Sequence, residues 1–311
     1  LCLAVSALGC GIRLPKPISR HARAIIGGRN VTTPDKWPWQ VLLVSYAGDT
    51  WACGATVISE QWIMTAGHCV TNNKTLVGIS ELRIFEGVTT RRQASEEKAR
   101  KVIEIHLHPD YDERPTVNDI AVLKLAEPFT FDNVVSPICL PNPSQTIPDN
   151  GQAVVTGFGK TDVTIDGSSQ VVYDGQLREA IVPIVNPEVC NELWSPTNTT
   201  EEIDEERFLD ERKTPKLVCA SSFDQGTHMG DSGGPLMMRD SSARWFQLGI
   251  ASYIHCDSTD CEAPGDGIRG DLFPKTFTDV RKYCDWIALS TGGEVTCYGS
   301  EVLLEDVGGK E

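Results

Sequence analysis

Residues 56–69 read Thr-Val-Ile-Ser-Glu-Gln-Trp-Ile-Met-Thr-Ala-Gly-His-Cys, a β-rich apolar segment that leads directly into a histidine and a cysteine. Similar short runs recur along the chain with turn-forming residues between them. They lie at residues 41–46, 56–65, 82–85, 102–107, 120–125, 153–156, 181–185 and 245–253. Strands without long helices between them predict an all-β sandwich or barrel. Asp279–Ser290 alone has the spacing of an amphipathic helix.

The composition is that of a folded, turn-rich protein of one or two domains, with 311 residues, 40% hydrophobic residues, 27 Gly and 18 Pro. The net charge of -15 argues against a nucleic-acid partner, because phosphate binding needs clustered Lys and Arg. No uncharged apolar stretch reaches the roughly eighteen residues that a membrane helix needs. We therefore expect neither a nucleic-acid nor a membrane partner.

The start of the chain and its cysteines indicate a secreted, extracellular protein. Residues 1–9 resemble the end of a signal peptide cut before Cys10, although a buried strand is the alternative. Glycosylation sequons at three asparagines fit secretion, namely Asn30, Asn73 and Asn198. The chain has 11 cysteines, and if Cys2 leaves with the expected signal peptide, ten remain. The even number that remains predicts disulfides in an oxidising compartment.

Composition also divides the chain into segments. We expect a signal remnant at 1–9, an exposed cleavable propeptide at 10–24, a folded domain at 25–291 and an acidic, Gly-rich, mobile tail at 292–311. Within the domain, the acidic run at 201–212 predicts a solvated loop or a short surface helix.

Three blocks carry the chemistry: Thr65–Cys69 with a histidine, Asn118–Leu125 with a carboxylate before a buried strand, and Gly230–Pro235 with a serine in a Gly-rich loop. A serine hydroxyl becomes a nucleophile when a base takes its proton. A histidine suits that role, and a buried carboxylate sets its tautomer. Backbone N–H groups of a Gly-rich loop can stabilise the resulting oxyanion. Together the blocks predict nucleophilic acyl transfer.

These motifs, in this order, resemble those of secreted serine proteases of the chymotrypsin/trypsin family, over about residues 10–290. Further matching blocks are Ile25–Gly28, Trp39–Val41, Gly157–Gly159, Thr278–Val280 and Asp285–Ile287. The resemblance implies two six-stranded antiparallel β-barrels, with the active site between them and a C-terminal α-helix. Residues 25–291 are then the protease domain.

The resemblance also implies roles for individual residues. His68 is the general base and acid, Asp119 orients it, and Ser232 is the nucleophile. The backbone N–H groups of Gly230 and Ser232 match the oxyanion hole. Ser252 matches the serine that supports the buried carboxylate and begins the substrate-binding strand.

Activation follows a modified pattern. Asp231 matches the acid that pairs with the new α-amino group of Ile25 after propeptide cleavage. Ala24 separates Arg23 from Ile25, whereas related zymogens are cut directly after Arg or Lys. Either the activating protease cuts after Ala24, or a trimming step follows, or activation is inefficient.

The family pattern implies three disulfides: Cys53–Cys69, Cys190–Cys219 and Cys10–Cys139. Another family bridge is missing at both ends, where Ala153 and Met238 stand, and His228 occupies a further cysteine position. The remaining cysteines can pair in three ways. We favour Cys256–Cys261 and Cys284–Cys297 on proximity.

The S1 pocket departs most from the family. Gly226 stands where trypsin-like members have the Asp that reads P1 Arg or Lys, and a cationic P1 side chain would be desolvated without a partner. Lys275 replaces a pocket-wall Gly and would favour an acidic P1 residue, unless its ammonium extends to solvent. Ile254 would narrow the entrance, which leaves small apolar P1 residues as the alternative.

The sequence therefore predicts a zymogen-activated serine endopeptidase that acts through an acyl-enzyme at Ser232. We expect protein or peptide substrates, an activating protease, a monomer, and neither cofactor nor metal. The alternative is a catalytically weak or inactive binding protein on a protease fold. A zinc hydrolase is disfavoured because the chain lacks a His-Glu-x-x-His block.

Overall fold

The computed structural model describes residues 9–12, 28–113, 116–148, 151–165, 168–193, 216–220, 226–252, 274–298 and 304–305. Several positions singled out from the sequence lie outside these ranges, namely Ile25, Asn198, the acidic run 201–212, Ile254, Cys256 and Cys261.

Six strands from the first half of the chain form a closed antiparallel barrel in the order β11-β4-β3-β2-β7-β8. Their bounds are β2 (Gln40–Ser45), β3 (Trp51–Val57), β4 (Trp62–Thr65), β7 (Leu82–Glu86), β8 (Arg100–Leu107) and β11 (Ala121–Leu125). Four consecutive apolar residues at 41–44 leave β2 without a polar face, and this strand is buried along its whole length.

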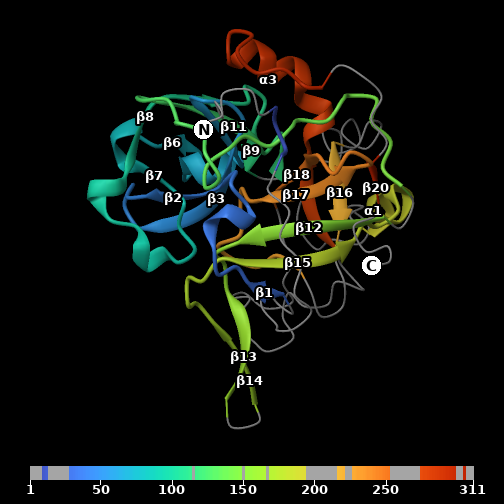
Figure 1. Cartoon of the computed structure of the whole chain (residues 1–311), viewed down its shortest axis with the longest axis horizontal. Helices are drawn as coiled ribbons and strands as arrows, with labels where there is room; N and C mark the ends of the chain where they lie inside the picture. The colour runs from blue at the N-terminus through green and yellow to red at the C-terminus, as the bar shows by residue number, and fades with distance from the viewer. Residues whose placement is uncertain are drawn as a thin grey trace, which may run out of the picture.

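Strands from the second half of the chain, together with β1 from near its start, form a sheet in the order β1-β15-β12-β17-β18-β19-β16, with β20 paired to β17. The bounds are β1 (Arg29–Asn30), β12 (Gln152–Gly157), β15 (Arg178–Pro183), β16 (Leu217–Ala220), β17 (Pro235–Asp240), β18 (Trp245–Ala251), β19 (Lys275–Asp279) and β20 (Leu304–Glu305). A bridge between Ile184 and Ala220 links β16 back to the end of β15 and closes six of these strands into a ring. The all-β expectation is confirmed, and the two barrels lie side by side (Figure 1).

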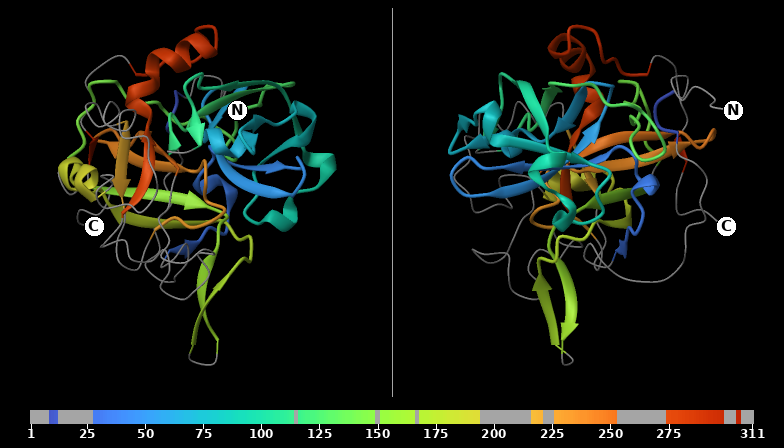
Figure 2. Two further views of the ribbon diagram at one scale, coloured as in Figure 1. Left: turned by 180° about the vertical axis from the view of Figure 1, so that it is seen from behind. Right: turned by 60° about the vertical axis from the view of Figure 1, so that its left-hand side comes forward.

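The remaining elements are short. In the described part of the chain the helices are α1 (Pro187–Leu193) and α3 (Cys284–Ser290), and 3-10 turns lie at Pro34–Lys36, Gly67–Val70, Ile79–Glu81, Arg91–Gln93, Glu96–Lys98 and Val280–Tyr283. The small hairpins are β5 (Thr71–Asn72) with β6 (Thr75–Leu76), β9 (Asp112–Glu113) with β10 (Thr116–Val117), and β13 (Thr161–Ile165) with β14 (Ser168–Val172). The β13–β14 hairpin projects away from the barrels in every view (Figure 2).

The strand pattern was wrong in two respects. The predicted run 56–65 is the end of β3 and all of β4, separated by a turn in which Ser59 Oγ accepts from the N–H of Trp62 at 3.2 Å. The sequence pattern also missed β16, β17 and β19, which are short or lack a run of β-branched and aromatic residues, although all but two of their residues are buried.

The tail was expected to be mobile from residue 292, yet its first part packs on the domain. Glu294 accepts hydrogen bonds from Trp62 Nε1 and Lys124 Nζ, both at 3.0 Å. Val295 lies in the core of the first barrel with 4% exposure. These contacts place residues 294–295 against the first barrel.

The structure contains the three disulfides implied by the family pattern, together with Cys284–Cys297. At the missing bridge, β12 and β17 are cross-strand partners and Ala153 and Met238 are both fully buried in the second core. Apolar packing thus replaces the disulfide at this position. Within the described residues, no helix has the length and apolar character to cross a membrane.

Candidate active site

His68 is placed by a sharp change of backbone direction at the end of β4. A single 3-10 turn begins at Gly67, and the disulfide of Cys69 with Cys53 ties this turn to β3. The backbone N–H of His68 donates to Asp119 Oδ1 at 2.8 Å, and its Nδ1 lies 2.8 Å from Asp119 Oδ2. One carboxylate therefore fixes both the backbone and the ring of the histidine.

Asp119 lies directly before β11 and is almost completely buried, with 2% side-chain exposure. Its Oδ2 also accepts a hydrogen bond from Ser252 Oγ at 2.6 Å, and its carbonyl accepts one from Thr278 Oγ1 at 2.9 Å. Ser252 and Thr278 belong to the second barrel, so the carboxylate is held from both sides of the barrel interface.

Asn118 is a positioning residue to which the sequence analysis gave no role. Its backbone has φ 51°, a left-handed conformation that Asn adopts more readily than most residues. Its Oδ1 accepts from Lys216 Nζ at 2.9 Å and from Tyr283 Oη at 3.1 Å, while its Nδ2 donates to the carbonyl of Asp110 at 3.0 Å. These contacts hold the bend that turns Asp119 inward. The available signal was an Asn at a bend before a buried strand.

The electrostatics of the pair favour a charged histidine beside a charged carboxylate. Burial alone would lower the pKa of His68, but the charge and hydrogen bond of Asp119 outweigh it and raise that pKa above its ordinary value. Burial alone would raise the pKa of Asp119, but His68 and the Ser252 hydroxyl together lower it. An imidazolium formed during a reaction would be stabilised here.

Ser232 lies in a loop that is seated on the first barrel. Its carbonyl accepts a hydrogen bond from the backbone N–H of Gly54 in β3 at 2.7 Å. At Gly233, with φ +76°, a Cβ would lie 2.2 Å from Thr65 Oγ1 and 2.3 Å from the carbonyl oxygen of Gly54. The loop thus touches the end of β4, three residues before His68, and this contact brings the Ser232 and His68 segments together.

The two backbone N–H groups predicted to bind an oxyanion have no acceptor within the described part of the chain. In the same loop, Gly233 donates to the carbonyl of Ala251 at 2.8 Å and Asp231 donates to that of His228 at 3.0 Å. Gly230 has φ +94°, a positive-φ backbone conformation that glycine adopts without a steric penalty.

Asp231 is fully buried. Its carboxylate accepts from the backbone N–H of Gly159 at 2.7 Å and of His228 at 2.9 Å. Burial raises its pKa to about 6, although both N–H donors and Arg178 oppose this. Any Cβ at Gly157 or Gly159 would come within 2.6 Å of this carboxylate, so the family's Gly-x-Gly block makes room for it.

The structure describes three of the predicted S1 residues, of which Gly226 and Lys275 are buried and Ser252 is partly buried. Gly226 is buried, and Lys275 in β19 is only 3% exposed, so its ammonium does not extend to solvent. Burial lowers the pKa of Lys275 to about 8. His228 is 2% exposed and accepts the N–H of Met229 at Nδ1 at 2.7 Å. Burial, followed by the charges of Lys275 and Lys160, lowers the pKa of His228 to about 4.

The structure also describes two of the predicted glycosylation sites and one group of residues with metal-ligand spacing. Asn30 and Asn73 are exposed, as glycosylation sites must be. Among the described residues, Cys53, His68 and Cys69 form the one group with metal-ligand spacing. Both of its sulfurs belong to a disulfide, which leaves them unsuited to metal ligation.

Two barrels that share a buried aspartate, with a histidine on one barrel and a serine loop from the other, are the arrangement of a trypsin-like serine protease. Residues 25–287 match the Trypsin family, and the chain belongs to that family. It is also similar to Ovochymase of Halocynthia roretzi, with 28% identity over 284 residues. The similarity covers 89% of this chain and 16% of that protein, so the chain spans less than a fifth of its relative's length.

Proposed function

We propose that the protein is a secreted serine endopeptidase, made as a zymogen. The observation that carries this proposal is the hydrogen-bonded chain Ser252–Asp119–His68, next to which the loop of Ser232 is seated. Membership of the Trypsin family and the disulfides support it.

In the proposed reaction, His68 takes the hydroxyl proton of Ser232 while the oxygen of Ser232 attacks the substrate carbonyl. The tetrahedral oxyanion accepts hydrogen bonds from the N–H groups of Gly230 and Ser232. His68 then gives the proton to the leaving amine, which produces the acyl-enzyme. Water hydrolyses this ester by the same steps, and Asp119 remains ionised throughout.

Activation is proposed to depend on Asp231. After cleavage before Ile25, the new ammonium would pair with this buried carboxylate and lower its pKa from about 6. In the uncut chain the carboxylate has backbone donors instead. Because Ala24 precedes Ile25, we expect activation to require removal of Ala24 from the new terminus.

The substrate preference is proposed to exclude P1 Arg and Lys. Gly226 offers no carboxylate, and the charge of Lys275 would repel a cation. An acidic P1 residue fits this charge, and a small apolar one is the alternative. A peptide-library profile of the cleaved protein decides between them, and cleavage after Arg or Lys would refute the proposal.

One experiment tests the catalytic function. An enteropeptidase site replaces residues 20–24, so that the cut falls directly before Ile25, and the cleaved protein is treated with a fluorophosphonate probe. Labelling that disappears in Ser232→Ala supports the proposed enzyme. If cleavage is complete and the protein stays folded but is not labelled, the enzyme proposal fails and a binding role is favoured.

A further inference from the structure

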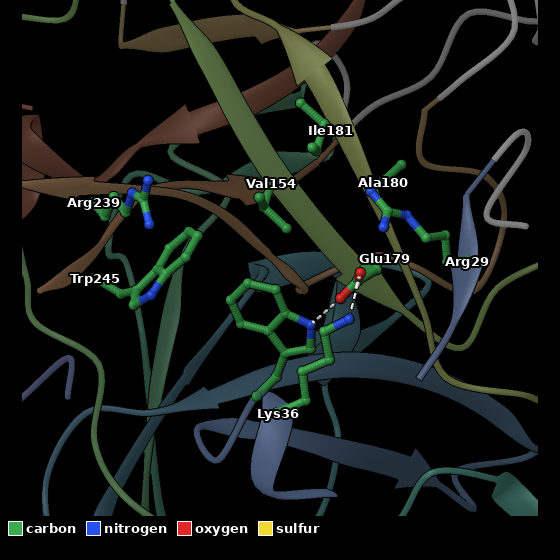
Figure 3. Close-up of a pocket in the computed structure, with 9 residues that line it drawn as sticks. Arg29, Lys36, Val154, Glu179, Ala180, Ile181, Arg239 and Trp245 are labelled. Atoms are coloured by element: carbon green, nitrogen blue, oxygen red, sulfur yellow. Dashed lines mark hydrogen bonds and ion pairs between the residues drawn. The ribbon is translucent and has the colours of Figure 1, made fainter. Parts of the chain in front are cut away.

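Arg178 lies on the core-facing side of β15. Strand residues alternate between two faces, so Arg178 shares its face with Ala180 and Val182, which belong to the core of the second barrel. The arginine is only 4% exposed. Glu179, the next residue, lies on the opposite face, where it accepts a hydrogen bond from Lys36 Nζ at 2.6 Å (Figure 3). A charged side chain in such an apolar core is costly unless an opposite charge lies near it.

The register of the second sheet places Arg178 beside Asp231. Arg178 is the cross-strand partner of Gly157 in β12, and the β-carbons of such partners lie on one face of the sheet, about 5 Å apart. At Gly157 a Cβ would lie 2.1 Å from Oδ1 of Asp231. The carboxylate therefore occupies the place of the missing Gly157 side chain, next to the base of the Arg178 side chain.

The charge of Arg178 is shared between two carboxylates. Its terminal nitrogens donate to Asp174, whereas its Nε is enclosed and has no acceptor among the described residues. The side chain of Asp174 is 43% exposed, so water screens this pair. Burial raises the pKa of Asp231 to about 6, and its two backbone donors, followed by the charge of Arg178, oppose that rise. The guanidinium thus already acts on Asp231 through the barrel interior.

We infer that Arg178 supplies, in the uncut chain, part of the positive charge that the ammonium of Ile25 would bring to Asp231 after cleavage, an inference that rests on the proposed function. Arg178 is then a positioning residue, because it acts through Asp231. The ionised carboxylate keeps its hydrogen bonds with the N–H groups of Gly159 and His228 before any cleavage. The uncut chain accordingly has a basal reactivity at Ser232.

The test compares labelling of the chain that carries the enteropeptidase site before and after cleavage. We expect the uncut chain to react with the fluorophosphonate probe within about a hundredfold of the rate of the cleaved chain, as for exchange of a direct charge pair for a more distant charge. Arg178→Gln should slow labelling of the uncut chain by about tenfold or more, but of the cleaved chain by about threefold or less, because the ammonium of Ile25 then supplies the charge. A merely structural role of Arg178 would slow both forms equally.

Three further variants separate charge from packing. Arg178→Lys keeps the charge, so labelling of the uncut chain should stay within about threefold of the unsubstituted rate. Arg239→Gln, at an arginine in β17 of the same barrel whose Nε is also enclosed (Figure 3), is the matched control and should leave both rates unchanged. Asp174→Asn removes the competing carboxylate and should speed labelling of the uncut chain. This variant carries the test if Arg178→Gln does not fold, which circular dichroism checks.

An NMR titration of the Asp231 carboxyl group in the uncut chain gives a readout that does not depend on activity. Its pKa, about 6 in the unsubstituted chain, should rise in Arg178→Gln and fall in Asp174→Asn. A labelled cleaved chain beside an unlabelled uncut chain, equal slowing of both forms in Arg178→Gln, or an unchanged pKa of Asp231 would overturn the inference alone. If neither form is labelled, the proposed function fails and this inference fails with it.

Discussion

The hydroxyl of Ser252 donates a hydrogen bond to Oδ2 of Asp119 over 2.6 Å, although the two residues are 133 positions apart in the chain. Ser252 follows the last residue of β18 in the second barrel, and Asp119 precedes β11 in the first. The same oxygen faces Nδ1 of His68 at 2.8 Å. The orientation of the histidine thus depends on how the two barrels are joined.

Replacement of Ser252 by Ala should slow fluorophosphonate labelling of Ser232 by about tenfold, the size expected for loss of one charge-assisted hydrogen bond. The pKa of Asp119 should rise, because one of the donors that lower it is gone. Ser252→Thr, which keeps the hydroxyl, should label faster than Ser252→Ala. If the two variants are equally slow, packing rather than the hydrogen bond explains the loss.

Replacement of Asp119 by Asn should reduce the labelling rate by about 10⁴-fold, as for the equivalent change in related triads. Burial would then act on His68 without an opposing charge, so its pKa should fall from above to below the ordinary 6.5. In the unsubstituted protein the labelling rate should rise with pH through a pKa above 6.5, since only neutral His68 can accept a proton. An NMR titration of His68 in the uncut chain measures both values, and an unchanged pKa would contradict the role given to Asp119.

His228 should make stability depend on pH. Its pKa is about 4 in the folded chain against 6.5 ordinarily, so the unfolded state takes up the proton first as the pH falls. The contribution of His228 to the free energy of unfolding is about 3 kcal/mol. It is fully present above pH 6.5 and is lost as the pH falls from 6.5 to about 4. Urea unfolding over that pH range measures it.

His228→Asn keeps an acceptor near the position of Nδ1 and removes the titrating group. Between pH 6.5 and 4 the free energy of unfolding of this variant should therefore fall by about 3 kcal/mol less than that of the wild-type chain. His106→Asn, the same change at a partly exposed histidine, is the control for the substitution itself. Identical curves for the wild-type chain and His228→Asn would refute the burial argument.

Replacement of Gly233 by Ala should unseat the loop of Ser232, because the new Cβ would lie 2.2 Å from Thr65 Oγ1. We expect a loss of at least about 3 kcal/mol in the free energy of unfolding, together with loss of labelling. Gly292→Ala also places Ala at a positive φ, +61°, but meets nothing within 4 Å. It should cost only about 1 kcal/mol. Equal losses of unfolding free energy at the two sites would show that the effect of Gly233→Ala comes from backbone strain and not from crowding by the new Cβ.

Local sequence was sufficient for the parts of the site that depend on neighbouring residues. The histidine after a β run, the Gly-rich serine loop and the carboxylate before a buried strand are each contained in one short segment. For the same reason the all-β class followed from the spacing of strands and turns. Strands β17 and β19 could not be recognised, because neither has a long run of β-branched or aromatic residues: β17 reads Pro-Leu-Met-Met-Arg-Asp, and β19 has Phe277 as its one large apolar residue.

The tertiary structure decided which side chains are buried and which hydrogen bonds form between residues that lie far apart in the sequence. The sequence alone predicted His68, Asp119 and Ser232 as a catalytic triad, because each lies in a short segment with a recognisable pattern. Only the fold decided that Asn118 is held by Lys216 and Tyr283 and that Lys275 and His228 are buried. The physical reason is that burial and hydrogen-bond partners arise from contacts between segments that no local pattern connects.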